Sequence, residues 1–264
     1  MLKAGMNCIK STALGVFLAI SSLSWTGAAA NPIETVQKPV SAEKTPSRTK
    51  IILGVSWMPG FCEKHSKTPE CIRQSDESAD ARQFSLSGLW RMRKTYCGVE
   101  SGLRDQDRKK DWLAMPELVL AEDVRLELAK AMPGVASGYD RHQWVKYGTC
   151  SGMVAEDYYG RALQMLAVLN GSDVRRLFED NLGGTIREEE VKAAFNSAFG
   201  AGAGNRVKMR CSKDGERRVI TGLTIGLGEL DDDGDAGDLA ALIASAGETR
   251  FGCKEGVVDE AGLQ

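Results

Sequence analysis

The sequence is poor in three features that define common classes of protein: histidines, closely spaced cysteine pairs and long apolar runs. It has only two histidines, His65 and His142, and no Cys-x-x-Cys pair, so it lacks the ligand spacing of a structural zinc site. Its most apolar segment, residues 11–25, is shorter than the about 20 residues that a membrane-spanning helix needs. No internal repeat is visible. We therefore expect neither a metal nor a cofactor.

The chain also lacks a net positive charge. The 264 residues carry a formal net charge of −2. Without the N-terminal 30 residues, which contain Lys3 and Lys10 and no acidic residue, the net charge is −4. A chain of this charge has no overall attraction to nucleic acid, so any RNA binding must come from local charge within a cleft.

The N-terminus has the pattern of a secretory signal peptide. Two lysines flank the start of the apolar run, and Ala28-Ala29-Ala30 supplies a small-residue cleavage site. We expect residues 1–30 to be removed, and the protein to be periplasmic or secreted without further membrane attachment. An uncleaved anchor is the alternative. Residues 31–49, rich in Pro, Thr, Ser and Lys, predict a disordered lead-in to one domain over residues 50–264.

Six cysteines remain after that cleavage. An even number in an exported protein indicates three disulfides, although six cysteines allow fifteen pairings. The six are Cys62, Cys71, Cys97, Cys150, Cys211 and Cys253.

Apolar periodicity predicts an α+β fold, with a central, mainly antiparallel sheet and helices packed beside it. The charged stretch 98–113 is expected to be a loop. Thr185 with Glu188 is interpreted as a capping box that opens a helix over residues 186–199. The other predicted elements are strands at 50–57, 83–89, 207–211 and 219–227, and helices at 121–132, 155–170 and 172–182.

One short stretch concentrates chemically useful side chains. Residues 141–151 read Arg-His-Gln-Trp-Val-Lys-Tyr-Gly-Thr-Cys-Ser. In a helix, His142 and Lys146 lie on one face, while Gln143 and Tyr147 lie about 100° around the axis. The four side chains would then line one edge of a cleft.

This stretch resembles the second active-site motif of the ribonuclease T2 family, roughly His-Glu-Trp-x-Lys-His-Gly-Thr-Cys. About 55 residues upstream, residues 84–91 read Phe-Ser-Leu-Ser-Gly-Leu-Trp-Arg, which is similar to the family's first motif, roughly Phe-Thr-x-His-Gly-Leu-Trp-Pro. Residues 57–62 are similar to its Trp-x-Pro-x-x-Cys. The resemblance covers about residues 50–258. Among family members, the chain resembles the bacterial, periplasmic, ribonuclease I-like proteins. This resemblance implies the family's α+β fold.

Three positions depart from the family motifs. Ser87 and Tyr147 stand at the two catalytic histidines, and Gln143 stands at the acidic residue. Family members cleave RNA to 2′,3′-cyclic phosphates, with imidazoles as general base and acid. A serine hydroxyl does neither task well near pH 7, and a tyrosine hydroxyl, with a reference pKa of about 10, is a weak acid. We therefore expect a pseudoenzyme whose endoribonuclease activity is lost or strongly impaired.

The remaining matches imply that RNA or nucleotide binding is retained, by a monomer. Lys146 matches the lysine that stabilises phosphate charge, and His142 matches an additional histidine near the phosphate. Trp90 matches a base-stacking tryptophan, and Tyr139 a base-contacting aromatic residue. Plainer structural roles are the alternative for each side chain. Two other functions stay open: a slow endoribonuclease that uses His142 and Lys146, and a secreted interaction protein that reuses the fold.

The family also implies the disulfide pairing Cys62–Cys71, Cys97–Cys150 and Cys211–Cys253, and chain proximity independently favours the first pair. The acidic run 231–238 superficially resembles a calcium-binding loop. It has Ala236 and Leu242 where an EF-hand needs glycine and glutamate, so we interpret it as an exposed loop.

Overall fold

A computed structural model describes residues 48–230 and 238–262, which belong to one compact unit of the chain, Glu43–Gln264. The predicted signal peptide, nearly all of the lead-in and most of the acidic run lie outside the described residues. The strands are β1 (Ile51–Ser56), β2 (Ser85–Arg91), β3 (Thr185–Arg187), β4 (Val207–Asp214), β5 (Arg217–Leu227) and β6 (Glu255–Val257). The helices are α1 (Met58–His65), α2 (Pro69–Ile72), α3 (Ser101–Arg108), α4 (Glu122–Ala131), α5 (Tyr139–Lys146), α6 (Ala155–Asn170), α7 (Asp173–Glu179), α8 (Glu188–Phe199) and α9 (Leu239–Ala244).

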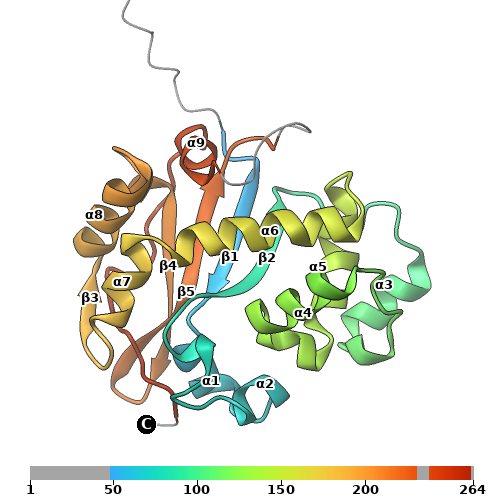
Figure 1. The fold of residues 1–264 in the computed structure, drawn as a ribbon, viewed down its shortest axis with the longest axis horizontal. Helices are drawn as coiled ribbons and strands as arrows, with labels where there is room; N and C mark the ends of the chain where they lie inside the picture. Colours follow the sequence, from blue (N-terminus) through green and yellow to red (C-terminus); the bar gives the residue numbers. More distant parts are fainter. Residues whose placement is uncertain (1–47, 231–237, 263–264) are drawn as a thin grey trace, which may run out of the picture. The chain divides into compact units, whose positions relative to one another are not determined.

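The described strands form one sheet in the order β2-β1-β5-β6-β3, with β4 paired to β5 (Figure 1). Every pairing between named strands is antiparallel except the short β5–β6 contact, which is parallel. The predicted α+β fold with a mainly antiparallel sheet is therefore confirmed.

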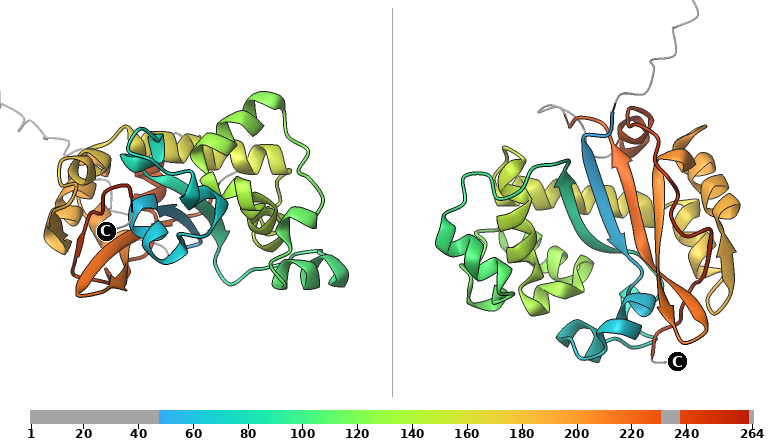
Figure 2. Two further views of the ribbon diagram at one scale, coloured as in Figure 1. Left: turned by 90° about the horizontal axis from the view of Figure 1, so that it is seen from below. Right: turned by 180° about the vertical axis from the view of Figure 1, so that it is seen from behind.

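The two faces of the sheet differ in what covers them. In β1, Leu53 and Val55 are fully buried in the main core, which also contains the inner face of α6. Tyr158 of α6 both donates to and accepts from the backbone of Leu89 in β2, so this helix is fixed across the sheet. The alternate β1 residues, Gly54 and Ser56, belong to the opposite face of the strand. In Figure 2, right, α6 passes behind the sheet, so the face away from α6 is turned toward the viewer.

Two predicted elements are wrong. The stretch 98–113 is not a loop, because it contains α3. This helix has few apolar residues, so its charged sequence gives no helical pattern. The predicted capping box at Thr185 is displaced: residues 185–187 pair with β6 as strand β3, and the helix begins at Glu188. Its N-terminal cap instead uses Arg187, whose backbone N–H donates to the Glu190 carboxylate at 2.9 Å. Pairing with β6 satisfies backbone groups that the sequence pattern assigned to the helix.

The three implied disulfides are confirmed. Cys62–Cys71 joins α1 to α2, and Cys211–Cys253 joins β4 to the segment before β6. Cys97–Cys150 joins the chain after β2 to the end of the stretch that contains α5.

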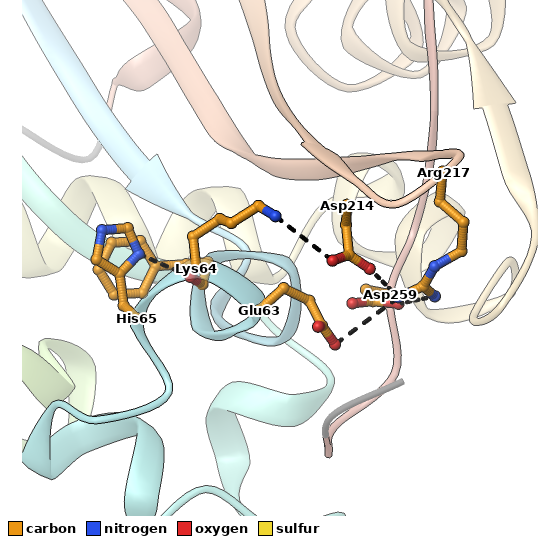
Figure 3. A network of polar contacts seen from close by, with 7 residues as sticks. Glu63, Lys64, His65, Asp214, Arg217 and Asp259 are labelled. Carbon is orange, nitrogen blue, oxygen red and sulfur yellow. Dashed lines mark hydrogen bonds and ion pairs between the residues drawn. The ribbon is translucent and has the colours of Figure 1, made fainter.

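A polar cluster fastens α1 to the β4–β5 hairpin and to the segment after β6 (Figure 3). Arg217 lies 2.6 Å from Asp214, 3.0 Å from Asp259 and 3.8 Å from Glu63. Lys64 adds a contact to Asp214 at 3.5 Å. The buried member, Asp259, has its pKa raised to about 6 by burial, with the Glu63 carboxylate adding to the rise and Arg217 opposing it.

We expect Asp259 to make stability fall as pH rises from about 4 to about 6. Its raised pKa means that the folded protein binds this proton more tightly than the unfolded chain, whose carboxyl has an ordinary pKa of 3.8. The stabilising contribution is therefore complete below pH 3.8 and is lost as pH rises through 6. Asp259→Asn should remove on the order of 2 kcal/mol of this pH dependence. Urea unfolding of both proteins at pH 4 and pH 7 measures it, and parallel changes in the two proteins would contradict the assignment.

Candidate nucleotide site

Helix α5 shows that the first part of the stretch 141–151 is helical, to Lys146, and it sets the positions of the side chains there. It starts after Gly138, whose φ of 74° is left-handed and whose Cβ, if present, would lie 2.9 Å from backbone atoms of Trp112 and Leu113. It ends at Lys146, so Tyr147 lies just beyond the last turn, with φ −123°. His142 and Lys146 therefore lie within the helix at the expected i, i+4 spacing. The direction of the Tyr147 side chain is set by a backbone that is no longer helical.

Gln143 is buried and holds Trp90 in place. Its Oε1 accepts a hydrogen bond from the indole Nε1 of Trp90 at 2.6 Å. Two glycines make room for this pair: a Cβ on Gly88 would come within 2.2 Å of Oε1, and one on Gly54 within 2.3 Å of the indole ring. The neutral amide at the family's acidic position therefore fixes the ring that is predicted to stack on a base.

His142 is bound to an acidic residue that the sequence analysis missed. Its Nδ1 lies 2.6 Å from Oδ1 of Asp107 in α3, and the other carboxylate oxygen accepts from the Tyr96 hydroxyl at 2.6 Å. The His142 side chain is 13% exposed and that of Asp107 is 1% exposed. Burial lowers the pKa of His142, and Asp107 opposes this lowering. Because Nδ1 is engaged by the carboxylate, Nε2 is the ring nitrogen left for a ligand.

We expect Asp107→Asn to lower the pKa of His142 further, because it removes the charge that opposes the effect of burial. A pH titration of the His142 ring by NMR measures this shift. The spectrum is simple, since His65 is the only other histidine. Asp105→Asn is a matched control: it makes the same change in α3, at an exposed residue paired with Arg108. An identical pKa of His142 in all three proteins would show that Asp107 has no electrostatic role.

Ser87 lies at the edge of an aromatic cavity. Its hydroxyl is 2.7 Å from that of Ser56 in β1, and the side chain is almost fully buried. The cavity has a volume of about 360 Å³, and Ser56, Ser87, Tyr139, Trp112 and Lys110 are among its lining residues. Burial raises the pKa of Tyr139 to about 12, so its hydroxyl stays protonated near pH 7. The exposed His65 also reaches this cavity, from the end of α1.

Tyr147 lines a second, smaller cavity of about 160 Å³, together with Leu89, Arg91 and Glu229. The Lys146 ammonium lies 5.1 Å from the centre of the Tyr147 ring, and no carboxylate of the described residues pairs with it. Trp90 connects the two regions, because its ring centre is 5.8 Å from that of Tyr147 while its indole also covers the glycine next to Ser87.

The structure thus brings the predicted residues into one continuous set of contacts. The ring centres of Tyr139 and His142 are 5.5 Å apart, and those of His142 and Tyr147 are 6.2 Å apart. The sequence analysis missed Asp107, Ser56 and Trp112. No local sequence pattern points to these three residues.

The described part of the chain contains no group of three or more His, Cys, Asp or Glu residues placed to hold a metal ion. None of its helices combines the length and apolar character that crossing a bilayer requires.

Comparison with known proteins gives consistent matches. The family model described as the ribonuclease T2 family matches residues 49–235. Ribonuclease I of Escherichia coli is 23% identical over 185 residues, which are 61% of this chain and 69% of that protein. Similar solved structures include RNase MC1 from bitter gourd seeds, with 17% identity, coverage of 67% of this chain and 89% of that one, and a TM-score of 0.42. Japanese pear S3-RNase has 13% identity, coverage of 72% and 88%, and a TM-score of 0.49. RNase NT in complex with 5′-AMP has 17% identity, coverage of 67% and 84%, and a TM-score of 0.42.

Proposed function

Because the chain belongs to the ribonuclease T2 family, we propose that it is an exported nucleotide- or RNA-binding protein whose endoribonuclease activity is lost or strongly impaired. The observation that carries the loss is the environment of Ser87. Its hydroxyl bonds to another hydroxyl, that of Ser56, and in the described residues no imidazole or carboxylate activates it. A hydroxyl pair supplies no base near pH 7.

Retained binding is supported by the parts of the site that need no proton transfer. Trp90 is half-buried and fixed by Gln143, which suits a platform for one base. Lys146 is a cation without a carboxylate partner in the described residues, so its charge is available to a phosphate. Tyr139 and Trp112 give the larger cavity an aromatic wall.

Binding without turnover is the result that tests this function. Mature protein should be stabilised against heat by a mononucleotide, and the effect should weaken as salt rises because charged side chains meet the phosphate. The same preparation should release few or no 2′,3′-cyclic phosphate ends from RNA. No stabilisation by any mononucleotide would favour the interaction-protein alternative.

A second candidate, a slow endoribonuclease, is favoured by the Asp107–His142 pair. A carboxylate that holds Nδ1 orients the ring and leaves Nε2 to act as a base, and Lys146 is one helical turn away. Cleavage that disappears in His142→Ala would support this candidate. Cleavage that persists in that variant would come from a contaminating nuclease.

Export to the periplasm or medium, and a monomeric state, belong to the same proposal. Export is supported by the sequence pattern of residues 1–30 and by the disulfides, which persist in oxidising compartments. Fractionation of cells with N-terminal sequencing of the mature chain tests export, and light scattering tests the oligomeric state.

A further inference from the structure

The side chain of Arg210 extends from β4 across the neighbouring strand β5 toward Ser56 in β1. In the strand register, Arg210 of β4 lies opposite Gly222 of β5, which lies opposite Ser56 of β1. Gly222 provides the passage, because a Cβ there would be 2.8 Å from Arg210 Nη2 and 2.9 Å from the Cα of Ser56. The guanidinium therefore crosses β5 where no side chain blocks it, and it ends near Val55 and Ser56 of β1.

This guanidinium is poorly satisfied by the protein. Its Nη2 donates to the carbonyl of Val55 at 3.0 Å, and its Nε is buried without a hydrogen-bond partner. No acidic side chain in the described ranges pairs with it, and burial lowers its pKa, with the nearby Tyr139 opposing the shift. An arginine stays charged in proteins. A half-buried guanidinium without a counter-ion therefore destabilises the fold unless an anion binds to it.

The groups around the guanidinium suit an anion. Ser56 and Ser87 present two hydroxyls 2.7 Å apart, and either one can donate. The Tyr139 hydroxyl, kept protonated by burial, is a further donor on the same cavity, where Arg210 opposes the rise of its pKa. A cation beside several hydroxyl donors matches the oxygens of a phosphate, which accept charge-assisted hydrogen bonds.

We propose that Arg210 is a phosphate-binding residue at the Ser87 end of the site, where it binds a nucleotide phosphate together with the Ser56 and Ser87 hydroxyls. The inference rests on the proposed function, and it assigns the phosphate a second cation, distinct from Lys146. It also gives a role to Ser87: a small residue there leaves room for the phosphate beside the guanidinium.

The test compares ligands that differ only in the phosphate. Calorimetric titration with 5′-AMP, adenosine and inorganic phosphate is carried out on the wild type, Arg210→Met and Lys208→Met. Lys208 is the matched control, because it is an exposed cation two residues away on β4, opposite Thr224 and not Gly222. We expect Arg210→Met to weaken 5′-AMP and inorganic phosphate binding about tenfold, the effect of one lost charge-assisted contact, and to leave adenosine within about twofold. Lys208→Met should bind all three within about twofold of the wild type.

The outcomes separate the inference from the function on which it rests. Equal 5′-AMP affinity in the wild type and a folded Arg210→Met protein overturns the role of Arg210 but leaves nucleotide binding intact. Phosphate binding that depends on Arg210, with no preference for 5′-AMP over inorganic phosphate, supports Arg210 and contradicts the nucleotide function. A wild type that binds neither overturns both. Arg210→Lys guards against a folding defect, because it keeps the charge and should recover part of the affinity.

Discussion

The double variant Ser87→His with Tyr147→His is expected to release 2′,3′-cyclic phosphate ends from RNA at least about 10²-fold faster than the wild type, the lower end for one acid–base group. The two changes place imidazoles at the positions that match the family's catalytic histidines. Lys146 already offers charge near the phosphate, and His142 is already oriented by Asp107. The cavity of about 360 Å³ beside Ser87 provides space for one of the new rings.

Each single histidine variant should stay near the wild-type rate, because base and acid act in one step and the loss of either removes most of the effect. The single variants are therefore the internal control for the double. Initial rates with a dinucleotide substrate, at several pH values around 6.5, measure all three proteins. A folded double variant at the wild-type rate would show that the separation of Ser87 and Tyr147 onto two cavities is incompatible with transesterification.

Removing the Cys97–Cys150 disulfide is expected to destabilise the protein by about 4 kcal/mol in the chain-entropy model, which relates the effect to loop length. This bond closes the longest loop of the three, with a sequence separation of 53 residues. It also ties the segment after β2 to the end of the α5 stretch, so the variant should lose nucleotide affinity as well as stability. Paired replacement by alanine, followed by urea unfolding, measures the change.

Replacement of Cys62 and Cys71 provides the comparison, because that bond spans only 9 residues and joins α1 to α2 without including the α5 stretch. This replacement should lower the free energy of unfolding by a smaller amount, about 3 kcal/mol. The nucleotide affinity of the folded protein should also fall less than in the Cys97–Cys150 variant. Equal losses of stability and affinity in both variants would mean that loop length and the clamp on α5 do not determine these effects.

The fold was largely predictable because the core elements carry strong patterns. β1 and α6 bury their apolar residues at the spacing of a strand and a helix, and both are found where expected. Helix α3 was missed because its sequence is almost wholly charged or polar, and a helix with so little apolar surface leaves no periodic signal. Strand β3 was missed because its formation depends on β6, about 70 residues away in the chain.

The candidate site was predictable only where its residues lie inside a motif. His142, Gln143 and Trp90 were found in this way, and the contacts among them follow from α5 and β2. Asp107 and Arg210 come from other elements, and they enter the site through tertiary contacts that no local pattern encodes. The partners of His142 and Ser87 therefore required the structure.

The glycines under Trp90 and Arg210 restrict the order in which mutations can be accepted. Gly54, Gly88 and Gly222 each occupy a place where one added carbon would collide with a large side chain or the backbone. Trp90 can be trimmed to a smaller residue first, whereas Gly54 cannot be enlarged while the indole is in place. Gly88 and Gly222 are restricted further, because an added Cβ would lie 2.2 Å from Gln143 Oε1 and 2.1 Å from the Val55 carbonyl oxygen, respectively. Ser87 and Tyr147 are under no such restriction. A lineage that exchanged its catalytic histidines could therefore keep this scaffold unchanged, and the route back to catalysis stays two substitutions long.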